Sequence, residues 1–219
     1  MRKLWGLLAV LLLGSVMLVS VWGKFPKFVA MSEITVAQAT SRLGVQLPMV
    51  GREESKRATP VESIVKPQTL SKTYYYRFGT EVPDKMVRTF EQAVAVYNET
   101  GIVNLVAGDA TAHQNEIAFF AYSKEMPEDQ STYLELGKGG PEIEEVTGFQ
   151  GYTANHARAG MNLKYPQSVR LSVAIHEIGH AVGLDHSHSH NSVMYPIDQG
   201  TTHLSAGDLK TLRHLYQKA

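Results

Sequence analysis

Residues 176–186 read HEIGHAVGLDH, and this is the most informative stretch of the sequence. Its first two histidines stand four residues apart, so on a helix His176 and His180 project from one face toward the same ion. Gly183 tolerates the left-handed backbone that ends a helix and turns the chain, which brings His186 round as a third ligand. Three imidazoles leave the fourth tetrahedral position of a zinc ion open. The pattern therefore predicts one catalytic Zn²⁺.

Glu177 directly follows the first histidine, where its carboxylate can reach a water on the metal without becoming a ligand. Zinc can lower the pKa of such a water to about 7, so the carboxylate can take its proton as the oxygen attacks a peptide carbonyl. We therefore expect a zinc-dependent endopeptidase with Glu177 as general base. The alternative is a catalytically silent, zinc-containing, membrane-tethered binding module, and the intact Glu177 argues against it.

Further histidines follow the motif, in the run His186, Ser187, His188, Ser189, His190. The spacing after the glycine selects His186 as the ligand. We expect His188 and His190 to be exposed loop residues, with a weak accessory metal contact as the alternative.

The extended motif resembles that of the metzincins, and the residues after it resemble the matrixin branch of that group. Ser187 directly follows the third histidine, as in matrixins. Residues 192–196, SVMYP, resemble the Met-turn of the family, whose methionine lies beneath the metal. The resemblance assigns this structural role to Met194 and Pro196, and it implies a matrixin-type zinc metalloprotease.

The end of the chain also resembles the terminal matrixin helix. Residues 204–216 read LSAGDLKTLRHLY, in which Ser205 and Asp208 have the spacing of a capping box. By resemblance, Asp208 tethers this helix to the Met-turn region. The implied fold class is α+β: a metzincin catalytic domain with a twisted, mixed, mostly parallel sheet, an active-site helix and a C-terminal helix.

Local patterns predict the other elements of this domain. The aromatic-rich KTYYYRF at 72–78 suits a first strand. DKMVRTFEQAVAVYNETG at 84–101 has apolar residues at helical spacing and ends on a glycine. We further expect strands within 102–107, 116–122 and 148–163, and a helix within 166–183.

The stretch 124–146 looks like a loop, with several acidic residues and three glycines. Ca²⁺ binding is conceivable there, but the regular spacing of oxygen ligands found in EF-hands is missing, so we expect a solvated acidic loop.

The N-terminus suggests export. Arg2 and Lys3 precede an uncharged, mostly apolar run at 4–23, and about 20 such residues suffice to cross a membrane. We interpret 1–24 as a signal anchor, or alternatively as a cleaved signal peptide. Either interpretation makes the rest extracytoplasmic, because positive residues stay in the cytoplasm. The protein would then be anchored in the membrane by this segment or secreted.

Residues 25–67 mix short apolar patches with charged residues and prolines, which indicates a linker or a propeptide-like stalk before a metalloprotease domain at 68–219. Matrixin proenzymes commonly block their zinc with a propeptide cysteine. This chain has no cysteine, so that form of latency cannot operate here.

Composition and the departures from the family pattern bear on partners. Lys+Arg and Asp+Glu are balanced at 21 each, so we expect a peptide or protein substrate and no nucleic acid. An extended peptide would lie along the edge strand of the sheet, to which residues 152–155 are candidate contributors.

Asp198 stands where the specificity-pocket wall of matrixins often has a tyrosine. His113 and His156 do not complete the family's structural zinc set.

Overall fold

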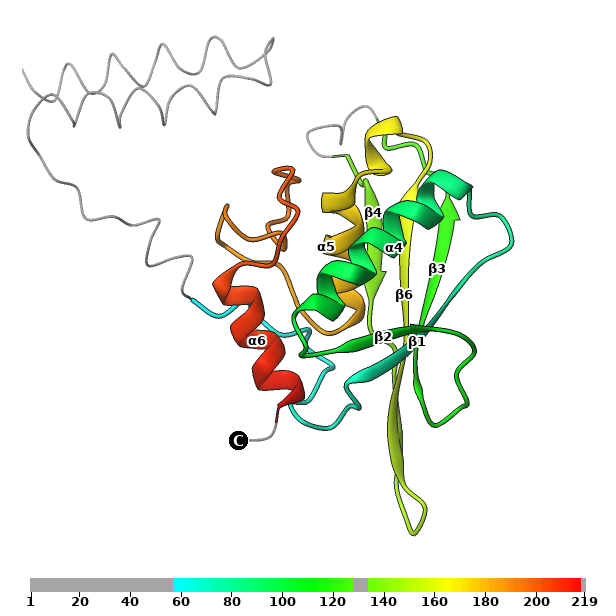
Figure 1. Cartoon of the computed structure of the whole chain (residues 1–219), viewed down its shortest axis with the longest axis vertical. Helices are drawn as coiled ribbons and strands as arrows, with labels where there is room; N and C mark the ends of the chain where they lie inside the picture. Colours follow the sequence, from blue (N-terminus) through cyan, green and yellow to red (C-terminus); the bar gives the residue numbers. More distant parts are fainter. Residues whose placement is uncertain (1–56, 128–133, 218–219) are drawn as a thin grey trace, which may run out of the picture. The chain divides into compact units, whose positions relative to one another are not determined.

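The computed structural model describes residues 57–127 and 134–217 (Figure 1). The expected signal segment at 1–24 and most of the expected linker lie outside these residues. In the part of the chain that the structure describes, no helix has the length and apolar character needed to cross a membrane.

The strands form one six-stranded sheet in the order β2-β1-β3-β6-β4, with β5 pairing separately with β6. Four strands run parallel, and β4 and β5 run antiparallel to β6. The mixed, mostly parallel sheet is therefore confirmed. The strands are β1 (Thr73–Phe78), β2 (Asn104–Ala107), β3 (Asn115–Tyr122), β4 (Gly137–Gly140), β5 (Ile143–Val146) and β6 (Tyr152–Asn162).

Helix α4 (Asp84–Glu99) packs its apolar stripe into the core, as its sequence spacing predicts. Phe90 is fully buried and stacks on Phe119 of β3, with ring centroids 4.3 Å apart. Gly101 has a φ of 65°, the left-handed conformation that ends a helix. Figure 1 shows α4 beside α5 (Leu171–Ala181) on one face of the sheet, and Tyr97 of α4 donates a hydrogen bond to the Ile175 carbonyl of α5 at 2.8 Å.

The helix expected at 166–183 is shorter than predicted. A 3₁₀ turn, η2 (Pro166–Ser168), comes first, and Arg170 is extended before α5 begins. Almost every residue of α5 is buried, because the helix packs against α4 and against strands β4 and β6. The terminal helix α6 (Ala206–Tyr216) begins with the predicted capping box of Ser205 and Asp208.

The loop expected at 124–146 is wrong in part, because β4 and β5 lie within it. The sequence of β4 is GKGG, which has little intrinsic preference for a strand. Close packing explains it: a Cβ at Gly139 would collide with the backbone carbonyl of Glu177 on α5. The calcium hypothesis stays a prediction, since residues 128–133 of this stretch lie outside the described residues.

The possible contribution of residues 152–155 to the substrate edge is not confirmed. These residues begin β6 and pair with Ile143–Val146 of β5, whereas β3 and β4 pair with β6 from His156 onward. The strand at that end of the sheet is β4, and its Gly137 and Gly139 lie against Glu177 of α5.

A short segment before β1 packs against the helical side of the domain. We call residues 59–62 the strap. Its Val61 forms an isolated bridge with Leu184, and Thr59 donates a hydrogen bond to Asp208 at 2.5 Å. The boundary near residue 68 stays a prediction, and these contacts favour placing it nearer to the N-terminus.

Candidate metal centre

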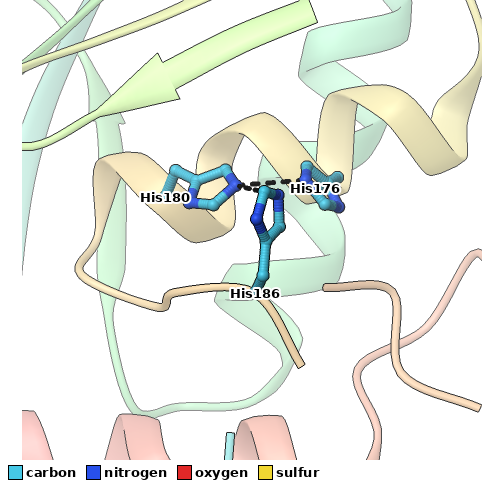
Figure 2. Close-up of side chains that lie close together, drawn as sticks. All are labelled: His176, His180 and His186. Carbon is cyan, nitrogen blue, oxygen red and sulfur yellow. Dashed lines mark hydrogen bonds between the residues drawn. The ribbon is translucent and has the colours of Figure 1, made fainter. Parts of the chain in front are cut away.

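Three histidines converge at the end of α5 (Figure 2). The Nε2 atom of His180 lies 3.1 Å from Nε2 of His176 and 3.3 Å from Nε2 of His186. The first two rings come from successive turns of α5, as the spacing predicts. His186 follows the turn at Gly183, whose φ of 99° is the left-handed conformation that only glycine adopts without strain.

The ring orientations suit a zinc ion. Nδ1 of His176 lies 2.7 Å from the Val193 carbonyl, and Nδ1 of His180 lies 2.8 Å from a carboxylate oxygen of Glu62. Both partners accept hydrogen bonds, so the Nδ1 atoms carry the protons and the Nε2 lone pairs face the common centre. The donor set of three converging Nε2 atoms therefore fits Zn²⁺.

The protonation states also suit a metal, which binds only neutral imidazole. Burial lowers the pKa of His176 to about 3, and the neighbouring His180 adds to the effect. Burial and His180 lower the pKa of His186 as well. These rings are thus neutral at physiological pH.

Glu177 is buried beside the triad, with 5% of its surface exposed. Burial raises its pKa to about 8, and the negative charge of Glu135 contributes. Glu135 is itself held by Lys124 at 2.5 Å and by the hydroxyl of Tyr122 at 2.9 Å. A carboxyl group with a pKa near neutrality can both take and return a proton.

A cleft of about 650 Å³ runs past these groups. The triad and Glu177 line it together with two segments, from Leu134 to Gly139 and from Tyr195 to Asp198. Asp198, the departure noted in the pocket wall, lies 3.5 Å from the guanidinium of Arg170 within this cleft.

Met194 lies under α5, fully buried, where a Cβ at Gly179 would collide with its sulfur. Its carbonyl accepts a hydrogen bond from the Ser187 amide at 2.9 Å. Ser192, two residues earlier, donates to the Asp208 carboxylate at 2.7 Å. Residues 192–196 are thereby tied to both the loop that carries His186 and α6. Pro196 lines the cleft.

The remaining candidates lie elsewhere. His188 and His190 are exposed, and His190 stacks on Tyr195. His113 stacks on Tyr152, and His156 lies 3.3 Å from Glu144. Within residues 57–127 and 134–217, the groups of three potential ligands are the triad and the set Glu62, His180 and Asp185.

The sequence analysis missed Glu62 and Glu135. Glu62 lies in the stretch that looks like a linker, and Glu135 in one that looks like a loop. No local pattern marks either residue, because both reach the site through tertiary contacts.

Several known proteins are similar to part of this chain. The profile of the matrixin family matches residues 84–217. The chain is 50% identical over 48 residues to macrophage metalloelastase from Oryctolagus cuniculus, a match that covers 20% of this chain and 10% of that protein. It is 50% identical over 48 residues to matrix metalloproteinase-26 from Homo sapiens (20% and 18%) and 46% identical over 52 residues to matrilysin from Felis catus (22% and 20%). The matched segment thus spans a fifth or less of these relatives.

Proposed function

Since this chain belongs to the matrixin family of metalloendopeptidases, whose members use a catalytic zinc ion, we propose that it is a zinc-dependent endopeptidase. His176, His180 and His186 would hold the zinc, and Glu177 would act as general base. One observation carries the proposal: three Nε2 atoms converge beside a buried carboxyl group in a cleft of about 650 Å³.

The bound zinc would supply Lewis-acid activation of water and of the substrate carbonyl. Glu177 moves the proton: one of its carboxylate oxygens takes it from the attacking water and returns it to the nitrogen of the leaving amine. The raised pKa of Glu177 favours the second half of this role, in which the carboxyl group holds the proton before it returns it. Gly137 of β4 leaves space for the Glu177 carboxylate, because a Cβ at this position would lie 2.5 Å from Oε1 of Glu177.

The proposed substrate is a peptide or protein segment in extended conformation. Strand β4 is the last strand of the sheet order, and its residues Gly137–Gly139 line the cleft. An extended chain can add to such an edge through backbone hydrogen bonds, which favours unfolded segments and flexible loops. This edge replaces the one expected at 152–155.

The first experiment compares the full-length, zinc-loaded chain with its Glu177→Ala variant on an unbiased peptide mixture. Cleavage by the parent alone supports the endopeptidase and begins to map its specificity. Equal cleavage by both proteins would refute the role of Glu177. A parent that binds one zinc tightly and cleaves nothing would favour the silent binding module instead.

An extracytoplasmic location is part of the proposal and rests on the pattern of residues 1–24. The catalytic domain would be secreted, or anchored outside the membrane by that segment. Protease added to intact cells should then degrade the domain, and resistance to that treatment would contradict the location.

A further inference from the structure

We infer that Glu62 is a positioning residue for the zinc ligand His180, and that the strap is therefore part of the metal centre. This inference rests on the zinc site of the proposed function. It goes beyond that function, because Glu62 lies upstream of the region that matches the matrixin profile.

The contact between the two side chains is short and sheltered. Oε1 of Glu62 lies 2.8 Å from Nδ1 of His180, and the two side chains are 24% and 10% exposed. A carboxylate only accepts hydrogen bonds, so Nδ1 carries the proton and Nε2 is left bare toward the triad. Glu62 thus sets both the tautomer and the ring orientation that a metal requires.

His176 offers a comparison within the same site. Its Nδ1 donates to the Val193 carbonyl, a neutral acceptor. The bond from His180 to a carboxylate is charge-assisted and roughly twice as strong as a neutral one. It also makes the imidazole a more basic ligand, as in the carboxylate–histidine–zinc arrangements of other metalloproteins.

Two backbone hydrogen bonds, at Pro60 and at Glu62 itself, fix the strap beside the turn after α5. The Glu62 amide donates to the Gly183 carbonyl at 3.0 Å, and the Asp185 amide donates to the Pro60 carbonyl at 2.9 Å. These bonds tie the strap to the turn that carries His186. The carboxylate is therefore placed by the same turn that places the third ligand.

The other end of the strap is tied to α6. Thr59 donates its hydroxyl to Asp208, and its own carbonyl accepts the hydroxyl of Thr211. A Cβ at Gly207 would collide with the Arg57 carbonyl, so the chain approaches α6 closely just before the strap. The strap, which precedes β1, therefore connects α6 at Thr59 with the zinc site at Glu62.

Glu62, His180 and Asp185 also lie close enough to share a cation. Two contacts favour the positioning role over that arrangement. Nδ1 of His180 already faces Glu62, and a carboxylate oxygen of Asp185 accepts the His186 amide at 2.6 Å. The number of zinc ions bound separates the two arrangements.

The test measures zinc affinity of the full-length chain by competition with a chromophoric chelator, with zinc alone as the probe. Glu62→Ala should bind zinc about 10- to 100-fold more weakly. Glu62→Gln keeps an oxygen acceptor but not the charge, so it should lose about half as much on a logarithmic scale. The matched control is Glu145→Ala, which breaks the exposed ion pair between Glu145 and Lys66. Lys66 lies four residues after Glu62, so this control should leave the zinc affinity unchanged.

Cobalt substitution supplies a spectroscopic readout. The visible absorption of the Co²⁺ form reports ligand geometry, so it should shift in the Glu62 variants and stay unchanged in Glu145→Ala. Parent affinity in both Glu62 variants, or an equal loss in Glu145→Ala, overturns the inference. So does the loss of a second bound zinc in Glu62→Ala, which would make Glu62 a ligand. If Glu62→Ala fails to fold, Glu62→Gln decides alone.

None of these readouts requires turnover. A parent chain that binds zinc and cleaves nothing would contradict the proposed endopeptidase, while the affinities would still decide the role of Glu62.

Discussion

Gly139 and Gly140 are neighbours on β4 that face different surroundings. A Cβ at Gly139 would collide with the backbone carbonyl of Glu177, whereas nothing lies within 4 Å of a Cβ at Gly140. The helix that carries His176 and His180 is thus packed directly on a glycine of β4. This contact explains at the level of single residues why the edge of the cleft is so rich in glycine.

We expect Gly139→Ala to lower the free energy of unfolding by about 1–3 kcal/mol, because the helix backbone must move to admit the methyl group. The substitution adds only one methyl group, so a loss of stability reports how closely α5 packs against β4. Thermal unfolding followed by circular dichroism measures the effect. Gly140→Ala is the control and should unfold at the parent temperature or slightly above it; equal destabilisation by both substitutions would contradict the packing argument.

Because the carboxyl group of Glu177 is buried, we expect the stability of the metal-free, chelator-treated chain to depend on pH. Burial and Glu135 raise its pKa to about 8, so the folded chain keeps a proton that the unfolded chain releases near its ordinary pKa. The stability from this group is complete below about pH 4.5 and is lost as the pH rises to about 8.

The glutamine in Glu177→Gln cannot titrate. Parent and variant both contain His176 and His180, so any contribution of these histidines cancels when the two proteins are compared. We therefore expect the difference in unfolding free energy, parent minus variant, to fall steadily between about pH 4.5 and 8. Urea unfolding at several pH values measures it. A difference that is constant or rises with pH would contradict the buried, protonated state.

At the scale of elements, α6 and the Met-turn are joined by one buried carboxylate. Asp208 accepts the amide of Ser205 at 2.8 Å, the hydroxyl of Ser192 at 2.7 Å and the hydroxyl of Thr59 at 2.5 Å. It therefore caps the helix, fixes the Met-turn and receives the strap at once. The sequence predicts the first two of these contacts, since the capping box is local and the tether follows from the family resemblance.

We expect Asp208→Ala to cost about 3 kcal/mol or more of unfolding free energy, because it leaves buried donors without an acceptor. Asp84, in the first turn of α4, is an exposed acidic residue at a comparable helix position. Asp84→Ala should cost less than about 1 kcal/mol, the usual value for a charge near a helix end. Denaturant unfolding of the two variants, side by side, checks the prediction, which fails if their losses are similar.

At the scale of the whole molecule, the strap makes the domain longer than its sequence pattern indicates. A chain that begins at Arg57 keeps every strap contact, whereas one that begins at Gln68 loses them together with Glu62. We expect the shorter chain to unfold several kcal/mol more easily, at about 1 kcal/mol for each lost hydrogen bond, and to bind zinc more weakly. Thermal unfolding and chelator competition on both chains measure this, and equal values would show that the strap is dispensable.

The sequence by itself determined the three candidate ligands, the candidate base and most of the order of elements. These depend on local geometry: side chains four apart share a helix face, glycine ends a helix, and a capping box needs only four residues. The tertiary structure decided which strand edges the cleft, that GKGG is a strand, and that Glu62 and Glu135 reach the site. Those features come from pairing between residues far apart in the chain, as in the contact between Glu62 and His180. Backbone pairing and close packing produce these features. A strand such as β4, which forms because of its neighbours, has no periodic pattern in its own sequence, and neither does the segment that contains Glu62.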